Sequence, residues 1–187
     1  MLNELLTYDK ELLIYLNNLG DMQFEAFWLY ITKFVYWIPL ILFIFYKIYT
    51  KFPKKQAIYI IGFGIILMLS SLLIVELIKI GVERMRPCND PTVAPFINIV
   101  IQPENYSFFS GHATVSVAFT TFLYLMVKQS LPWIRLLVLW PILFMYSRLY
   151  FGVHYPSDIF TGMIVGILIG IAFHRICNAC IVKLRIY

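Results

Sequence analysis

Five long runs of apolar residues divide this chain, and they limit the folds open to it more than any other feature. The runs are Trp28 to Tyr49, Ala57 to Val75, Ala113 to Val127, Leu131 to Ser147 and Ile159 to Phe173. A helix needs roughly 20 mostly apolar residues to cross a bilayer, and flanking Lys and Arg side chains can snorkel so that a helix extends beyond its apolar run. Of all residues, 61% are hydrophobic and 13% are charged, and the mean hydropathy is +0.80. We therefore expect an all-α, integral-membrane bundle of about five spans that forms one domain over residues 1–187.

The segment Met1 to Asn18 has a different pattern. Its leucines alternate with charged residues on a roughly helical period, namely Leu5, Leu6, Leu12, Leu13 and Leu16 with Glu4, Asp9, Lys10 and Glu11. This pattern is typical of an amphipathic helix that lies in the membrane interface. We expect such a helix here instead of a sixth span.

The distribution of Lys and Arg predicts how the bundle is oriented. Short cytoplasmic loops are enriched in basic residues. If the first loop is cytoplasmic, that side receives Lys47, Lys51, Lys54, Lys55, Lys128, Arg135, Arg175, Lys183 and Arg185, and the other side keeps Lys10, Lys79, Arg84, Arg86 and Arg148. The net charge of +5 then reflects membrane topology, so we expect no nucleic-acid partner.

The first cluster of candidate site residues lies at the end of the second apolar run. Glu76, Lys79, Glu83 and Arg86 are spaced by three, four and three residues, which predicts one shared helical face. Lys79 and Arg86 could then hold one anion between them. Pro87 favours ending the helix at that point. The alternative is that both cations only snorkel to the interface.

The second cluster is Ser110-Gly111-His112, at the start of the third run. Ser110 is a good N-cap, Gly111 allows a ligand close to the backbone, and the free amides of a first helical turn attract anions. His112 would be aimed at a phosphate bound there and could donate a proton near neutral pH. An ordinary capped helix with an interfacial histidine is the alternative.

The third cluster is Ser147-Arg148 followed by His154 and Asp158. A guanidinium binds phosphate oxygens through two parallel hydrogen bonds, which a lysine does not. Asp158 is four residues after His154 and could accept a hydrogen bond from one imidazole nitrogen, which leaves the other nitrogen nucleophilic. A simple interfacial hydrogen-bonded pair is the alternative.

Together the three clusters resemble the signature of the type 2 phosphatidic acid phosphatase superfamily, which reads K-x6-RP, PSGH and SR-x5-H-x3-D. The matching residues here are Lys79, Arg86-Pro87, Ser110-Gly111-His112, Ser147-Arg148, His154 and Asp158. Their order and spacing agree from the second apolar run to the fifth. Phe109 departs from the proline usual in the family, and an obvious sixth span, which many membrane members have, is missing.

The resemblance implies a lipid phosphatase that uses neither metal nor cofactor. His154 would attack phosphorus to form a phosphohistidine, Asp158 would orient His154, and His112 would protonate the leaving group and later activate water. The remaining matched groups would hold the phosphate oxygens and stabilise the charge of the transition state, namely Lys79, Arg86, Ser110, the Gly111 amide and Arg148.

A phosphate site at the membrane surface favours an amphiphilic substrate. The family implies undecaprenyl pyrophosphate or a lipid A phosphate first, with phosphatidylglycerol phosphate or phosphatidic acid as alternatives. The expected partners are this lipid substrate and the bilayer, and the oligomeric state stays open. The expected location is the bacterial inner (cell) membrane, as a multi-pass protein whose site faces the periplasm or cell exterior.

Other classes of protein make different demands on the sequence. A transporter would be expected to show repeated halves and broken helices near the bilayer centre, and the sequence indicates neither. A lipid-binding protein could use surface cations without needing His154 and Asp158. The vanadate-dependent haloperoxidases of the same superfamily have a similar oxyanion site but are typically soluble.

Three further features carry separate expectations. Glu76 is either a functional acid or an ion-pair partner of Lys79 or Lys33. His174 lies near the inner end of the last run, and we expect it outside the site. Cys177 and Cys180 are one helical turn apart without a second ligand pair, so we expect no metal there.

Overall fold

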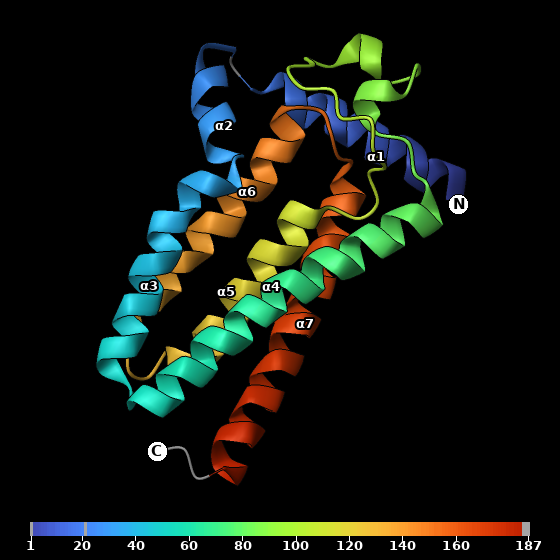
Figure 1. Ribbon diagram of the computed structural model, residues 1–187. Coiled ribbons are helices and arrows are strands. Elements are labelled where there is room, and N and C mark those ends of the chain that lie inside the picture. The colour runs from blue at the N-terminus through green and yellow to red at the C-terminus, as the bar shows by residue number, and fades with distance from the viewer. Residues whose placement is uncertain (1, 21, 185–187) are drawn as a thin grey trace.

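The computed structural model describes residues 2–20 and 22–184, and within them every regular element is helical. The α-helices are α1 (Leu2–Asn18), α2 (Glu25–Ile31), α3 (Ile38–Lys51), α4 (Lys54–Val82), α5 (Gly111–Val127), α6 (Leu139–Tyr150) and α7 (Pro156–Lys183). Short 3-10 helices cover Met22–Phe24, Phe34–Trp37, Pro87–Asn89, Ala94–Phe96 and Pro132–Val138. The all-α prediction is confirmed (Figure 1). Met1 and Arg185, which the sequence analysis assigns to the N-terminal helix and the cytoplasmic side, lie outside the described residues.

Helix α5 is the centre of the bundle, and it packs against α4, α6 and α7. Its contact with α7 is the closest because three glycines of α7, Gly162, Gly166 and Gly170, face it. A Cβ atom added to Gly166 would lie 2.7 Å from the carbonyl oxygen of Thr114. Small residues let two helix backbones approach to this distance. The residues that begin α5 and α7 are thereby held side by side.

Helix α1 runs across one end of the bundle, where the long connection between α4 and α5 also lies (Figure 1). Its buried Asn17 donates from Nδ2 to the carbonyl oxygens of Leu149 (3.1 Å) and Tyr150 (2.7 Å). These carbonyls belong to the last turn of α6, beyond the reach of its i to i+4 hydrogen bonds, and that of Leu149 also accepts from the N–H of Gly152 at 3.0 Å. Helix α1 therefore fixes the end of α6. Its place in the membrane interface stays a prediction.

Three of the described segments are long and apolar enough to cross a bilayer, namely Phe34–Lys51, Lys54–Asn89 and Pro156–Lys183. Helix α5 is apolar but shorter. Helices α4 and α7 extend beyond their apolar runs, as expected. The number of five spans is not confirmed and stays a prediction.

The first expected span, Trp28 to Tyr49, is not one continuous helix. After α2, Lys33 has extended backbone angles (φ −84°, ψ 116°), and a 3-10 turn leads into α3. Pro39 lies in the first turn of α3. A proline inside an α-helix removes one N–H group and clashes with the carbonyl four residues earlier. The run is therefore divided near its start into α2 and α3, and Pro39 was the available signal.

Two other boundaries differ from expectation, and the first of them lies beside candidate site residues. Helix α4 ends at Val82 and not at Pro87, because Glu83 adopts left-handed angles (φ 52°) and its N–H bonds the carbonyl of Lys79 at 2.9 Å. Arg86 is therefore in the following loop and does not share a helical face with Lys79. The fourth expected span, Leu131 to Ser147, begins as a 3-10 helix before α6 starts.

Candidate active site

A cavity of about 750 Å³ opens between α3 and α4 and ends beside α5 and α6. Six of the eight predicted site residues line it, namely Lys79, Arg86, Gly111, His112, Arg148 and His154. The other two, Ser110 and Asp158, are completely buried behind this wall. The three sequence clusters therefore meet in one place, although they come from segments far apart in the chain.

His154 and Asp158 form the pair that the sequence predicts, in a looser geometry. His154 lies in the turn before α7, and its Nδ1 is 3.4 Å from Oδ2 of Asp158. The same oxygen accepts a hydrogen bond from the backbone N–H of Tyr155 at 3.0 Å. If Nδ1 carries the proton toward Asp158, Nε2 keeps its lone pair and faces Arg86, whose Nη1 is 3.2 Å away.

The environment of His154 favours the neutral form of its imidazole. The side chain is 2% exposed. Burial lowers the pKa of His154 below its ordinary value, and the nearby positive charges of Arg86 and Arg148 lower it further. A neutral imidazole has the lone pair that a nucleophile needs.

Two buried arginines, Arg86 and Arg148, place positive charge near His154. Two segments hold Arg86. Its Nε and Nη2 donate to Asn105 in the loop before α5, and its Nη1 donates to the carbonyl of Val153 in the turn before α7. Arg148 comes from α6 and donates from Nη1 to Oγ1 of Thr32 at 2.7 Å. Its Nε is buried and has no hydrogen-bond partner among the described residues. A buried donor without a partner is costly, so this nitrogen is suited to an anionic ligand.

The start of α5 supplies backbone donors. Ser110 is the N-cap of α5, and its Oγ accepts from the N–H of Ala113 at 3.5 Å. Gly111 lines the cavity directly after it. The N-cap prediction for Ser110 is confirmed. The first turn of a helix combines exposed amides with a favourable dipole for anions.

His112 lies in the cavity wall but points its Nε2 at the carbonyl oxygen of Thr32, 3.1 Å away. A carbonyl oxygen only accepts, so this nitrogen carries the proton. The expectation that His112 is aimed at a phosphate stays a prediction. For proton transfer, Nε2 has to exchange the Thr32 carbonyl for an oxygen of the substrate.

Lys79 and Glu76 form an ion pair one turn apart on α4. Lys79 Nζ is 3.0 Å from Glu76 Oε1, and the Glu76 side chain is 56% exposed. Of the two expectations for Glu76, the pairing with Lys79 is present. Glu76 also lines the cavity, so the pair lies at the entrance to the cluster of cations.

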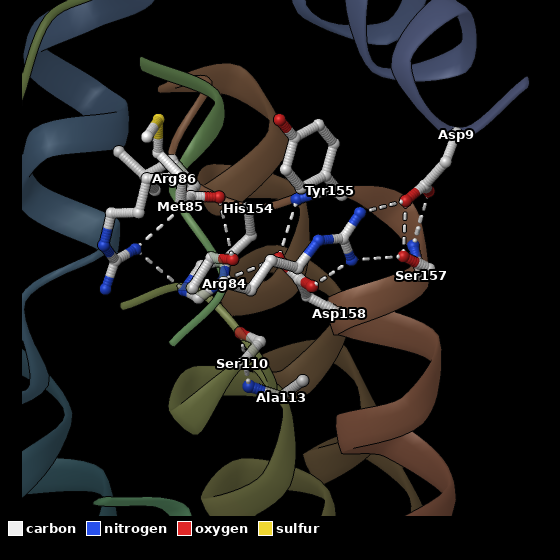
Figure 2. A network of polar contacts seen from close by, with 12 residues as sticks. Asp9, Arg84, Met85, Arg86, Ser110, Ala113, His154, Tyr155, Ser157 and Asp158 are labelled. Carbon is white, nitrogen blue, oxygen red and sulfur yellow. Dashed lines mark hydrogen bonds and ion pairs between the residues drawn. The ribbon is translucent and has the colours of Figure 1, made fainter. Parts of the chain in front are cut away.

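Sequence reasoning missed four residues that the structure brings to the site: Asp9, Thr32, Arg84 and Asn105. Thr32 lies at the break before α3, where its hydroxyl and carbonyl contact Arg148 and His112. Asn105 had no signal, since one amide in an irregular loop resembles any other. Arg84 bonds Asp158 and Asp9 at 2.6 and 2.8 Å, as Figure 2 shows.

The rest of the cavity is apolar. Its walls are side chains of α3 and α4, including Ile38, Ile41, Leu42, Phe45, Ile65, Met68, Leu69 and Leu72. Leu42 and Leu69 are 59% and 63% exposed, so this part is open on the outer side of the bundle. Along α4 the lining changes from Leu72 and Val75 to Glu76 and Lys79 within about two helical turns. The cavity can hold an apolar chain and an attached anionic group together.

Comparison with known proteins agrees with this geometry. The sequence matches the PAP2 superfamily over residues 58–181. It is 27% identical to a lipid A 4'-phosphatase of Bacteroides thetaiotaomicron, covering 99% of this chain and 84% of that protein. It is 31% identical to an undecaprenyl-diphosphatase of Sulfolobus acidocaldarius, covering 70% of this chain and 58% of that protein. The fold resembles the crystal structure of a transmembrane PAP2 type phosphatidylglycerolphosphate phosphatase from Bacillus subtilis, with a TM-score of 0.74, 18% identity and coverage of 95% of this chain and 88% of that one.

Proposed function

The chain belongs to the PAP2 superfamily, and on this basis we propose that it removes a phosphate or pyrophosphate group from a membrane lipid through a phosphohistidine on His154. It is a lipid phosphatase of a bacterial membrane. The observation that carries the assignment of the site is the cavity wall in which His154, His112 and three cations meet the start of α5. In this proposal, these groups together bind and transfer one phosphoryl group.

In the proposed first step, Nε2 of His154 attacks phosphorus and forms an N–P bond. The bond between phosphorus and the leaving oxygen breaks, and its electron pair goes to that oxygen, which takes a proton from His112; the leaving oxygen belongs to the lipid alcohol in a monophosphate and bridges the two phosphorus atoms in a pyrophosphate. Asp158 holds Nδ1 and stabilises the positive charge that develops on the imidazole. In the second step, His112 takes a proton from water, and the water oxygen attacks phosphorus. The N–P bond then breaks, inorganic phosphate is released, and the imidazole of His154 is neutral again.

Fixed positive charge would stabilise both transition states. Lys79, Arg86 and Arg148 contribute cations, and Ser110 and the Gly111 amide contribute donors at the helix N-terminus. Arg148 has the clearest free donor, its Nε. In this proposal the cations take the part that a metal ion has in other phosphatases, so no metal is required.

The apolar half of the cavity supports a substrate with a long hydrocarbon chain. A chain between α3 and α4 would place its phosphate beyond Glu76, at Lys79. A lipid A phosphate and undecaprenyl pyrophosphate are the leading candidates, since a lipid A 4'-phosphatase and an undecaprenyl-diphosphatase are among the relatives that match the sequence. Phosphatidylglycerol phosphate and phosphatidic acid are the alternatives, and a panel of these lipids separates them.

The experiment that tests the function is phosphate release by the purified protein in detergent, with each lipid phosphate in the presence and absence of EDTA. We expect release of phosphate from at least one lipid, unchanged by EDTA. Loss of activity on chelation would contradict the metal-free mechanism. Orthovanadate should inhibit, because it adopts the five-coordinate geometry of the phosphorus in transit.

Replacing His154 by Ala separates a phosphatase from a lipid-binding or transport protein. We expect phosphate release to fall to the background while binding of the lipid, measured with a fluorescent analogue, is kept. His174→Ala is the matched control, since His174 contacts Met126 and does not line the cavity. A His154→Ala protein with normal turnover would rule out the phosphohistidine.

A further inference from the structure

We infer that Arg84 is a positioning residue for the His154–Asp158 pair, and that helix α1 holds Arg84 in place through Asp9. This inference rests on the role proposed above for Asp158. Arg84 is not among the matched signature residues, and α1 lies outside residues 58–181 that match the superfamily. The N-terminal helix would thus be part of the catalytic apparatus.

The two carboxylate oxygens of Asp158 have different partners. Oδ1 accepts from Nη1 of Arg84 at 2.6 Å. Oδ2 accepts from the N–H of Tyr155 at 3.0 Å and faces Nδ1 of His154 at 3.4 Å. Because Arg84 occupies Oδ1, the carboxylate cannot turn without breaking a short charge-assisted bond. Arg84 thereby keeps Oδ2 available to His154.

On its other side Arg84 is held by α1. Its Nη2 donates to Oδ2 of Asp9 at 2.8 Å, and its guanidinium lies over the ring of Tyr155, 4.0 Å from the centroid. Oδ1 of Asp9 accepts from the backbone N–H of Ser157 at 2.9 Å. Asp9 therefore also caps the first turn of α7, the turn that contains Asp158. Figure 2 shows Arg84 between the two carboxylates.

The charges make Arg84 necessary at this place. The Asp158 side chain is 0% exposed and that of Asp9 is 10% exposed. Without Arg84, two poorly hydrated carboxylates would lose the cation that they share, and carboxylates in such surroundings take up a proton. A protonated Asp158 is a poorer acceptor for the Nδ1–H of His154. The groups that face Asp158 from the elements packed against it are Arg84, Arg86, Ser107, His154, Tyr155 and, through Ser157, Asp9.

The experiment compares kcat, KM and the pH profile of kcat/KM for purified full-length variants on one lipid substrate. In Arg84→Met we expect kcat to fall roughly 10-fold to 100-fold with little change in KM, since the nucleophile is misplaced and the phosphate contacts are intact. The acidic limb of the profile should move to higher pH, because Asp158 has lost the cation that favours its charged form. The titration of the substrate phosphate is common to all variants and cancels in the comparison.

Two further variants separate charge from geometry. Arg84→Lys keeps the charge but contacts only one carboxylate at a time, so the acidic limb should return toward the wild-type pH while kcat stays low. Asp9→Asn can still accept from the N–H of Ser157 but removes the negative charge that holds Nη2 of Arg84, so kcat should fall several-fold through loss of this ion pair, with no upward move of the acidic limb. Asp9→Asn is nearly isosteric, so it remains informative if Arg84→Met does not fold.

Lys10→Met is the matched control. Lys10 is the neighbour of Asp9 on α1 and bonds Asp90 (2.9 Å) and Thr92 (2.7 Å) in the loop; it is connected to Asp158 only indirectly, through Asp90 and the hydroxyl of Tyr155. We expect wild-type kcat and pH profile for this variant. If Lys10→Met loses as much activity as Asp9→Asn, then α1 matters only as packing and the inference is wrong.

The remaining outcomes distinguish this inference from the proposed function. A wild-type pH profile and kcat in Arg84→Met, with Asp158→Asn inactive, would overturn the role of Arg84 and leave the phosphatase assignment intact. An active Asp158→Asn variant would overturn the roles of Asp158 and Arg84 together, since Arg84 would then position a residue of no catalytic use, and the phosphatase assignment would still be tested by His154→Ala.

Discussion

His154 shows how burial and charge determine the chemistry of a single residue. Its pKa is lowered by burial first and then by Arg86 and Arg148, so the imidazole should stay neutral at a pH where an ordinary histidine, with a pKa of about 6.5, is half protonated. Histidine NMR of the ligand-free protein would measure this directly. In Arg86→Gln the His154 resonance should titrate at higher pH, since one positive charge is gone. Titration of His154 at or above the ordinary value in the wild type would contradict the neutral nucleophile.

Arg148 makes a second prediction at this scale, because its planar guanidinium offers Nε and Nη1 in different directions. Nη1 bonds Thr32 while Nε is left for the substrate. A lysine offers a single ammonium group and cannot do both. We expect Arg148→Lys to reduce kcat/KM by about 10-fold to 100-fold, which corresponds to one or two charge-assisted hydrogen bonds. Arg135→Lys, an exposed arginine outside the cavity, should retain wild-type kcat/KM.

Most of the eight candidate residues were found from spacing because spacing within one helical end or turn is a local property. Ser110 as the cap of α5 and Asp158 four residues after His154 are of this kind. The partners that arrive from distant segments were not predictable in the same way. Thr32 reaches Arg148 across 116 positions of sequence and Asp9 reaches Ser157 across 148. Such contacts depend on how the elements pack, which no local pattern reports.

At the scale of elements, the α5 and α7 pair makes the strongest prediction. Gly166→Ala should destabilise the protein by about 1–3 kcal/mol, since the new methyl group meets the backbone of α5 and overpacking costs that much. Thermal unfolding in detergent would measure this. Gly62→Ala is the matched control, because a Cβ at Gly62 meets nothing within 4 Å. Equal melting temperatures for the two variants would mean that the helices do not need the close approach.

The positions of the helices were predictable from hydropathy, but their ends and interruptions were not. Apolar runs located α4, α5 and α7 because the apolar side chains of each helix must either pack inside the bundle or face the lipid. The break before α3 depends on Pro39, and the early end of α4 depends on the left-handed angles of Glu83. A hydropathy average does not respond to either feature, since both concern backbone geometry.

For the whole molecule, the orientation in the membrane is a prediction from the Lys and Arg distribution. It can be checked with single cysteines in a variant whose three native cysteines are replaced. We expect a membrane-impermeant thiol reagent to label Tyr106→Cys on intact cells or spheroplasts, and Lys54→Cys only after the membrane is opened. The reverse pattern would place the site in the cytoplasm. The single domain over residues 1–187 also remains a prediction.

The gap between α3 and α4 opens on the outer side of the bundle, where Leu42 and Leu69 are mostly exposed. A substrate that enters there arrives by diffusion within one leaflet, and the dephosphorylated lipid leaves the same way, while phosphate departs into water. The turnover rate should then follow the mole fraction of substrate among the surrounding amphiphiles and not its amount per volume of solution. Diluting the substrate with inert detergent at constant bulk concentration would slow such an enzyme, which is the behaviour called surface dilution.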